Sequence, residues 1–220
     1  IREAGTPNEG RAAVYVASQF VAMGLDTRVQ ALPAYYIYSQ NVIAVKAGLD
    51  PEAGVIYIGA HYDSVQWGPG ANDNASGTAV LLEAARLLAN ETFSPTLTFI
   101  AFGSEEIGLG GSSYFTIHLP PLERYVARGM INLDCVGWGT AQAIGYADDS
   151  ADPLVQKAVD NATALNIPVE LERVSNSDHA PFSWVKIPAI LLYSYTPDAQ
   201  DCGPNYHQAT DTADTVDPVA

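Results

Sequence analysis

Apolar residues along the chain follow two spacings, one typical of buried strands and the other typical of helices. Four mostly apolar runs are bounded by glycine or polar residues, as in strands covered on both faces; they occupy residues 54–60, 96–102, 128–134 and 187–195. Apolar positions three and four residues apart predict helices over residues 8–24, 76–90 and 152–166. Shorter strands are expected at residues 27–32, 41–48, 142–147 and 169–174.

The alternation of strands and helices predicts an α/β fold, a three-layer αβα sandwich with a central mixed, largely parallel sheet. Gly24 is expected to end the first helix, and Asp152 to cap the last one. No repeat, low-complexity tract or linker divides residues 1–220, so we expect a single domain. The chain begins at Ile1 without a leader pattern, and residues 213–220 resemble the first turn of a helix. We therefore expect a processed chain with a truncated C-terminal helix.

Composition and charge narrow the class of protein. Hydrophobic residues make up 48% of the 220 residues and charged residues 16%, which is typical of a globular domain with a sizeable core. The 25 acidic and 10 basic residues give a formal net charge of −15. This charge repels nucleic acids and anionic membranes, so neither is expected as a partner. No apolar run reaches the roughly 18 residues of a membrane-spanning helix.

Two sequence features concern covalent modification. Cys135 and Cys202 could form one disulfide bond, but the sequence leaves open whether they meet. N-x-S/T sequons occur at Asn74, Asn90 and Asn161, and they matter only where the source glycosylates its proteins.

The adjacent glutamates Glu105 and Glu106 follow a strand that is expected to be buried. Desolvating even one carboxylate costs several kcal/mol unless it is paired or bound to a metal. In α/β folds, ligands collect at the carboxyl ends of the strands. Other imidazole and carboxylate side chains also follow the predicted strands or precede a helix there. These side chains are His61, Asp63, Asp73, Asp134 and His207.

Imidazole and carboxylate side chains are ligands that suit zinc. Three carboxylates and two neutral imidazoles would carry a formal charge of about −3, which calls for two divalent cations rather than one. Glu105 then remains free to act as general base on a water bridging the two ions. Asp63 can hold the second ring nitrogen of a ligating histidine. The five expected ligands are His61, Asp73, Glu106, Asp134 and His207.

The segments GAHYDS, GANDNASGTAVLLEAAR, FGSEEIGLGGS, MINLD, SDHAPF and YHQATDTADTVD together resemble the zinc aminopeptidases of family M28. These are co-catalytic two-zinc peptidases with secreted bacterial members. The likeness runs from about residue 5 to residue 218. It implies that Asp73 bridges two zinc ions and that Glu105 is the catalytic base. It implies one zinc on His61, Asp73 and Asp134, and the other on Asp73, Glu106 and His207.

The resemblance also implies finer features of the site. Family members carry a cis peptide bond after the bridging aspartate, which here is Asp73–Asn74. Tyr206 matches a tyrosine that hydrogen-bonds the tetrahedral oxyanion in some relatives. In SDHAPF, Asp178 or His179 is expected to reach the site indirectly; the alternative is that Ser177 or Asp178 only caps a helix.

The chain departs from the family pattern in three places. Asn176 stands where some bacterial relatives carry an arginine, which leaves a guanidinium contact to substrate in doubt. Residues 35–45 run straight through, without the inserted protease-associated domain of larger relatives. The C-terminal helix of the family is expected to be truncated here.

The resemblance implies a secreted exopeptidase that removes N-terminal amino acids from peptides. Carboxypeptidase and glutaminyl cyclase chemistry on the same scaffold, or a receptor-like module without catalysis, are the alternatives. A carboxypeptidase needs cationic groups for a carboxylate, and the segments quoted above hold one basic residue, Arg86, within a predicted helix. An apolar first side chain is expected in a pocket near the ends of the motifs. Its candidate lining residues are Trp138, Ile144, Phe182 and Tyr193. Oligomeric state and native metal remain open.

Overall fold

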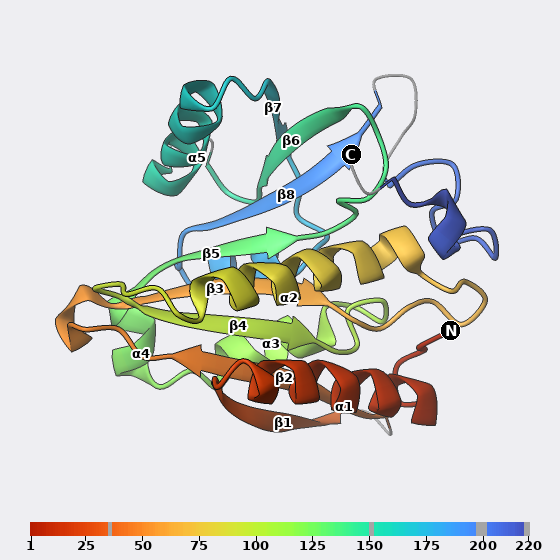
Figure 1. The fold of residues 1–220 in the computed structure, drawn as a ribbon, viewed down its shortest axis with the longest axis horizontal. Helices are drawn as coiled ribbons and strands as arrows, with labels where there is room; N and C mark the ends of the chain where they lie inside the picture. Colours follow the sequence, from red (N-terminus) through yellow and green to blue (C-terminus); the bar gives the residue numbers. More distant parts are fainter. Residues whose placement is uncertain (35–36, 150–151, 197–201, 218–220) are drawn as a thin grey trace.

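An eight-stranded sheet organises the computed structural model, which describes residues 1–34, 37–149, 152–196 and 202–217 (Figure 1). The strands are β1 (Asp26–Ala34), β2 (Ile37–Lys46), β3 (Val55–His61), β4 (Thr96–Phe102), β5 (Ala127–Leu133), β6 (Ala141–Tyr146), β7 (Val169–Arg173) and β8 (Ala189–Tyr195). Their order in space is β1-β2-β4-β3-β5-β8-β6-β7. The β3–β4, β3–β5, β5–β8 and β6–β7 pairs are parallel, and the other three described pairs are antiparallel. The sheet is therefore mixed and largely parallel, as predicted.

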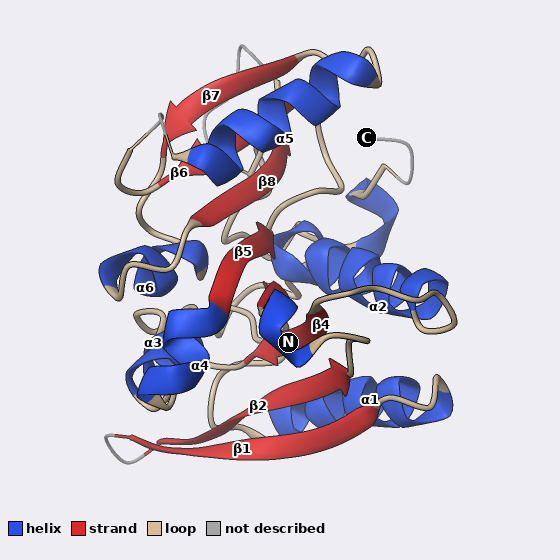
Figure 2. Cartoon of the chain, turned by 90° about the vertical axis from the view of Figure 1, so that its left-hand side faces the viewer, coloured by secondary structure: helices blue, strands red, loops and turns tan. Residues whose placement is uncertain are grey.

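Helices cover both faces of the sheet, which confirms the predicted three-layer sandwich (Figure 2). One layer holds α1 (Pro7–Ala22), α2 (Gly77–Leu88) and α5 (Pro153–Ala164); the other holds α3 (Gly110–Ile117), α4 (Pro121–Val126) and α6 (His179–Trp184). The apolar spacing predicts the first layer, but in the second layer only the start of α6 was expected. α3 begins with two glycines and contains residues of low helix propensity. α4 and α6 have six residues each, too few for a periodic pattern.

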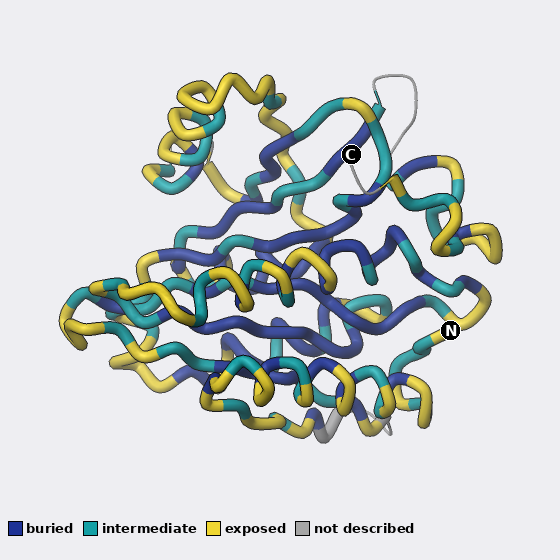
Figure 3. The backbone as a smooth tube through the Cα atoms, in the orientation of Figure 1, coloured by how far each residue is buried: buried dark blue, intermediate teal, exposed yellow. Residues whose placement is uncertain are grey.

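The two faces of the sheet bury different side chains, because neighbouring strand residues point to opposite faces. Phe99 of β4 packs with Phe20 of α1, their ring centroids 6.3 Å apart. On the other face, Phe102 packs with Phe115 of α3 and Phe182 of α6 at 6.4 and 6.2 Å. The central strands are accordingly the most buried part of the chain (Figure 3). They form a firm support for the loops that follow them.

The helix α5 forms where the apolar spacing predicted it, but it is less buried than the spacing suggested. Asp152 caps it as expected, by accepting a hydrogen bond of 2.7 Å from the backbone N–H of Leu154. Val155 is the single buried residue of α5, and Leu165, expected on the apolar face, is 69% exposed. α5 lies over the outer part of the sheet (Figure 1), where few strands are available to cover it.

The carboxyl ends of four parallel strands meet at one edge of the sheet. β3, β4, β5 and β8 all point toward this edge, at the right of Figure 1, and the C-terminal segment 202–217 returns to it. The loops that carry the expected ligands therefore lie together. Within the described parts of the chain, no helix has the length and hydropathy needed to cross a bilayer.

Candidate metal centre

Asp73 lies between two histidines that are far apart in the sequence. Its Oδ1 is 3.1 Å from Nε2 of His61, and its Oδ2 is 3.1 Å from Nε2 of His207. His61 closes β3, and Asp73 belongs to the irregular turn Ala71–Ser76 that leads into α2. His207 comes from the C-terminal segment. The two oxygens of one carboxylate are thus divided between two imidazoles.

Two further carboxylates complete the expected set. Asp134 follows β5, and its Oδ1 is 3.4 Å from Nε2 of His61. Glu106 follows β4, and its Oε2 is 3.0 Å from Nε2 of His207. All five residues expected as ligands are therefore brought together. They form a His61–Asp134 half and a His207–Glu106 half, which Asp73 joins.

The donor atoms fit divalent zinc in both type and spacing. In a tetrahedral site with bonds of 2.0–2.1 Å, neighbouring donor atoms are about 3.3 Å apart, and the four contacts here measure 3.0–3.4 Å. Oδ1 of Asp134 is buried without a hydrogen-bond partner among the described residues. A buried carboxylate oxygen in that state calls for a cation. Cys135 lies close to Asp73 and Asp134, but a disulfide bond removes its thiol from consideration.

The electrostatics of the cluster also call for positive charge. Burial lowers the pKa of His61, but Asp134 and Glu105 outweigh burial and raise the pKa well above its ordinary value. Burial raises the pKa of Asp73, but hydrogen bonds from His207 and His61 outweigh it and hold the pKa below its ordinary value. Burial, together with the nearby Asp73, raises the pKa of Glu106 to about 7. The cluster therefore has more negative charge than its histidines can balance.

Asp63, expected to hold the second ring nitrogen of a ligating histidine, contacts both sides of the cluster. Its Oδ1 is 3.3 Å from Nδ1 of His61. Its two oxygens also accept hydrogen bonds from the backbone N–H groups of Glu105 and Glu106, at 3.1 and 3.2 Å. One fully buried carboxylate thus fixes the imidazole and the turn that presents both glutamates.

Three supporting residues were missed by the reasoning from sequence. Asp211 accepts hydrogen bonds from the backbone N–H groups of Asn72 and Asp73, at 2.7 and 3.1 Å. Ser177 donates to Oδ2 of Asp134 at 2.6 Å. Arg2 donates to backbone carbonyls of the loop between His61 and Asp73. Asp211 follows His207 by four residues, and this closeness to an expected ligand is the one signal that pointed to it.

Glu105, the expected base, lies on the His61–Asp134 side. Its carboxylate falls within 4.8 Å of ligand atoms of both residues. Burial raises its pKa well above the ordinary value, and the charges of Asp178 and Asp134 add to the effect, although His61 opposes it. Glu105 is thus close to the ligands without belonging to the four ligand contacts measured above.

Tyr206 and Asp178 differ in their surroundings. The ring of Tyr206 stacks on His207, with centroids 3.8 Å apart, and lines the same cavity as Glu105. Asp178 is fully buried before α6, and its oxygens make no hydrogen bond among the described residues. It does not cap α6 with its side chain, and burial raises its pKa to about 7. His179 turns away, with Nε2 2.8 Å from the carbonyl oxygen of Val174.

The segment after Asp73 is held in one conformation. The Asp73–Asn74 peptide bond is cis, as the family resemblance implied. The side-chain Nδ2 of Asn74 donates to the carbonyl of Leu133. The side-chain oxygen of Asn74 accepts hydrogen bonds from the backbone N–H groups of Gly77 and Cys135. Asn74 is fully buried, so its sequon is closed to glycosylation in the folded chain.

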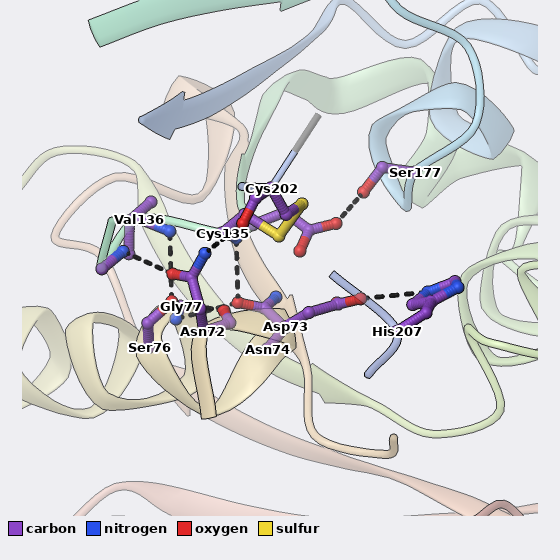
Figure 4. The surroundings of a disulfide bond; sticks show 12 residues. Asn72, Asp73, Asn74, Ser76, Gly77, Cys135, Val136, Ser177, Cys202 and His207 are labelled. Carbon is purple, nitrogen blue, oxygen red and sulfur yellow. Dashed lines mark hydrogen bonds and ion pairs between the residues drawn. A yellow bond between two sulfur atoms is a disulfide. The ribbon is translucent and has the colours of Figure 1, made fainter. Parts of the chain in front are cut away.

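A disulfide bond joins Cys135 to Cys202, which settles a pairing that the sequence left open (Figure 4). Cys135 directly follows the ligand candidate Asp134, and Cys202 lies in the C-terminal segment before His207. The carbonyl of Cys202 also accepts a hydrogen bond of 3.0 Å from the side chain of Asn72. The bond therefore ties the C-terminal segment to both the end of β5 and the turn that carries Asp73.

A cavity of about 670 Å³ opens from Asp73, Glu105 and Asp134. Of the four residues expected to line an apolar pocket, Tyr193 alone is among its lining residues. Phe182 and Ile144 are instead 0% and 2% exposed, because Phe182 of α6 packs into the aromatic core and Ile144 of β6 points toward α5. Trp138 packs against Gly203. The expected apolar pocket is therefore wrong in most of its residues.

The fold and the site define an α/β protein with a candidate two-metal centre at the carboxyl edge of its sheet. The model of peptidase family M28 matches residues 41–220, and the chain belongs to this family.

Individual relatives agree with this assignment. Over 184 residues the chain is 34% identical to aminopeptidase YwaD of Bacillus subtilis, covering 81% of this chain and 40% of that protein. Over 185 residues it is 37% identical to leupeptin-inactivating enzyme 1 of Streptomyces exfoliatus, covering 82% and 41%. The chain thus spans about two-fifths of these relatives. A solved zinc aminopeptidase from Bacillus subtilis shares the fold, with a TM-score of 0.91, 22% identity and coverage of 97% and 86%.

Proposed function

We propose that the chain is a metal-dependent exopeptidase that removes N-terminal amino acids from peptides, using two zinc ions. The observation that carries this proposal is the division of the Asp73 carboxylate between His61 and His207, at 3.1 Å each. Membership of family M28 supports it, as do the names of the two relatives, an aminopeptidase and a leupeptin-inactivating enzyme. The His61 half would hold one ion and the His207 half the other.

Bound zinc ions would supply an acidified water and polarise the scissile carbonyl. Glu105 is the group that accepts the proton of this water at its carboxylate. It then delivers the proton to the departing amine, so that water is added across the peptide bond. Asp63 keeps Glu105 in position by accepting a hydrogen bond from the backbone N–H of Glu105. Tyr206, which lines the same cavity as Glu105, would donate its hydroxyl proton in a hydrogen bond to the developing oxyanion.

The charges around the cavity favour a substrate amine over a substrate carboxylate. Glu105 and Asp134 line the end of the cavity next to the metal centre, and carboxylates stabilise an ammonium group there. Arg173 is the one basic residue among the described lining residues, and its Nε donates to the carbonyl of Ala147. A carboxypeptidase would need a free cationic group for the C-terminal carboxylate. We therefore prefer an aminopeptidase.

Secretion is part of the same proposal. The Cys135–Cys202 disulfide belongs in an oxidising compartment, since thiols in the cytosol are kept reduced. Mass analysis of the natural protein from culture medium and from cells, with and without alkylation, would test this. A protein found only in the cytosol with free thiols would contradict it.

The activity is tested with leucyl and other aminoacyl anilides, before and after chelation and after zinc is restored. We expect release of the anilide only in the zinc-loaded protein, with two zinc ions per chain. Release from carboxyl-blocked but not amino-blocked peptides separates an aminopeptidase from a carboxypeptidase. One zinc per chain together with cyclisation of N-terminal glutamine would favour a glutaminyl cyclase. Metal binding without any turnover would favour a receptor-like module.

A further inference from the structure

The turn after β4 carries both the expected base and one of the expected ligands. The backbone N–H groups of Glu105 and Glu106 donate to Asp63, as described above. The two preceding N–H groups, of Gly103 and Ser104, lie in a buried part of the chain, where an N–H group needs an acceptor. Their acceptors are side chains that come from a different part of the fold.

Asn41 of β2 and Glu9 of α1 supply these two acceptors, and both residues are 0% exposed. The N–H of Gly103 donates to Oδ1 of Asn41 at 3.2 Å. Burial raises the pKa of Glu9, and hydrogen bonding to the backbone N–H of Ser104 is among the contacts that oppose this rise. A Cβ atom at Gly103 would lie 2.8 Å from Oε1 of Glu9 and would collide with the hydroxyl of Ser39. The carboxyl group of Glu9 is thus packed directly against the backbone of the turn.

Capping of α1 accounts for one carboxyl oxygen of Glu9 but not for the other. Thr6 is the N-cap of α1, and Glu9 stands three residues later, in the pattern of a capping box. Oε2 accepts a hydrogen bond of 2.6 Å from the backbone N–H of Gly5. Oε1 instead accepts a hydrogen bond from the hydroxyl of Ser39 in β2 and lies next to Gly103. The first turn of α1 is at the same edge of the sheet as the ends of β3 and β4 (Figure 1).

Ser104 has an unusual backbone conformation that requires support. Its φ is 59°, in the left-handed region, which is unfavourable for a residue with a Cβ atom and persists where surrounding contacts fix it. Its carbonyl accepts a hydrogen bond of 2.8 Å from the N–H of Gly110, which closes the turn onto the start of α3. Because Ser104 directly precedes Glu105, its backbone angles set the direction in which the turn carries that glutamate.

We propose that Glu9 is a positioning residue, which holds Ser104 in its left-handed conformation and thereby keeps Glu105 directed at the metal centre. The proposal rests on the exopeptidase function proposed above, in which Glu105 is the base. Loss of Glu9 should reduce the fraction of molecules with the productive turn, and that fraction should keep its contacts with substrate. kcat should therefore fall while KM stays nearly unchanged.

The kinetic test compares Glu9→Ala with Glu9→Gln in the zinc-loaded protein, with a leucyl anilide as substrate. We expect kcat of Glu9→Ala to fall by roughly 5–30-fold, as the cost of an unsupported left-handed residue allows. Glu9→Gln keeps an acceptor oxygen for Ser104 and should keep most of the wild-type kcat. Val16→Ala, at a buried apolar position of the same helix, is the matched control for lost stability. Equal losses of kcat in Glu9→Ala and Val16→Ala would overturn the proposal.

A second substitution, in the turn itself, tests whether Glu9 acts through Ser104. Glycine adopts the left-handed conformation freely, so Ser104→Gly in the Glu9→Ala background should restore part of the lost kcat. A loss of helix capping would not be repaired in this way, and a double variant no more active than Glu9→Ala would contradict the proposal. If Glu9→Ala does not fold, Ser39→Ala takes its place, because it frees Oε1 of Glu9 and leaves the cap intact.

Hydrogen exchange of the metal-free protein makes the test independent of turnover. Residues 103–109 should exchange faster in Glu9→Ala than in the wild type, and faster than in Val16→Ala. Unchanged exchange of this segment overturns the proposal. If the zinc-loaded wild type cleaves no anilide, the exopeptidase function fails, and the exchange comparison still decides whether Glu9 holds the turn. If Glu9→Ala cleaves anilides with the wild-type kcat, this inference fails and the exopeptidase function stands.

Discussion

Asp211 accepts a hydrogen bond from the backbone N–H of Asp73, with 3.1 Å between the nitrogen and Oδ2. Its other oxygen accepts from the neighbouring N–H of Asn72 at 2.7 Å. Asp211 is 2% exposed, so this carboxylate is turned inward and orients the turn that carries Asp73. The contact crosses 138 positions of the chain and couples the C-terminal segment to the start of α2.

Replacing Asp211 should therefore weaken metal binding without removing a ligand. Asp211→Ala loses both hydrogen bonds, and we expect zinc affinity to fall by roughly 10–100-fold. Asp211→Asn keeps one acceptor oxygen, so its zinc affinity should fall less. Competition with a fluorescent zinc chelator measures the affinity, and Asp160→Asn, at an exposed position of α5, is the control. Unchanged affinity in Asp211→Ala would show that the turn holds its shape alone.

Arg2 should act on the same loop from the other side. Its guanidinium donates to the carbonyls of Tyr62, Pro69 and Gly70 at 2.6, 2.7 and 2.8 Å. Lysine cannot make this planar set of bonds. Arg2→Lys should therefore lose most of the support that Arg2 gives the loop, and Arg2→Ala should lose all of it. We expect a lower kcat with little change in KM and faster zinc release. Arg11→Lys, on the surface of α1, serves as the comparison, and an equal loss there would argue against a local role.

Glu105→Gln should separate metal binding from catalysis. The amide cannot accept the proton of the bridging water, so turnover should fall by roughly 10²–10⁴-fold. Metal content, measured by elemental analysis, should stay at the wild-type value because the ligand contacts join Asp73, Glu106 and Asp134 to the histidines. The control Glu91→Gln, at an exposed acid of the loop after α2, should leave turnover and metal content unchanged. Full activity in Glu105→Gln would assign the base to another group.

The Cys135–Cys202 bond closes a loop of 67 positions. On the chain-entropy model a loop of this size contributes about 4 kcal/mol to the free energy of unfolding. We expect Cys135→Ser, Cys202→Ser to show that loss in urea denaturation, together with weaker zinc binding in the His207 half. Wild-type protein treated with a reductant should behave like the variant. If reduction changes neither quantity, the bond does not support the centre.

The stability of the protein should depend on pH through Glu9, which is not among the expected metal ligands. Burial raises the pKa of Glu9 to about 7, and the charge of Asp63 adds to this rise. Hydrogen bonds from Ser39 and Gly5 lower the pKa but do not outweigh burial. The folded state thus keeps a proton that the unfolded chain releases near pH 4.5. This contribution to stability is full below pH 4.5 and is lost as pH rises toward 7.

Glu9→Gln keeps a neutral group at this position and should flatten that dependence. We expect the difference in free energy of unfolding between wild type and variant to change between about pH 4.5 and pH 8. The change should be on the order of 1–2 kcal/mol after allowance for screening. Urea denaturation at a series of pH values measures it, with Glu91→Gln as the reference. Parallel curves for wild type and Glu9→Gln would show that Glu9 is ionised in the folded state throughout.

Local pattern was sufficient for the central strands and for the ligand candidates. Residues 96–102 form β4 with the predicted bounds, because an apolar run between Pro95 and Gly103 leaves few alternatives. His61 and Asp134 follow buried strands, and parallel strands deliver their carboxyl ends to one edge. Their convergence therefore required only the order of strands and helices.

The supporting contacts were beyond such reasoning. Asp211, Ser177 and Arg2 act on residues 43 to 139 positions away, and no local spacing encodes such a partner. The error over Phe182 has a similar cause. Closeness to a motif in sequence was taken as closeness to the cavity, but the six-residue helix α6 turns Phe182 into the aromatic core.

β7 is the outermost strand at one end of the sheet. An outer strand has unpaired backbone groups and is a template for fibril growth. Glu170, Glu172 and Arg173 are all exposed along β7, and two copies meeting edge to edge would bring their glutamates together. These charged residues of β7 therefore oppose pairing of this edge with another copy of the chain.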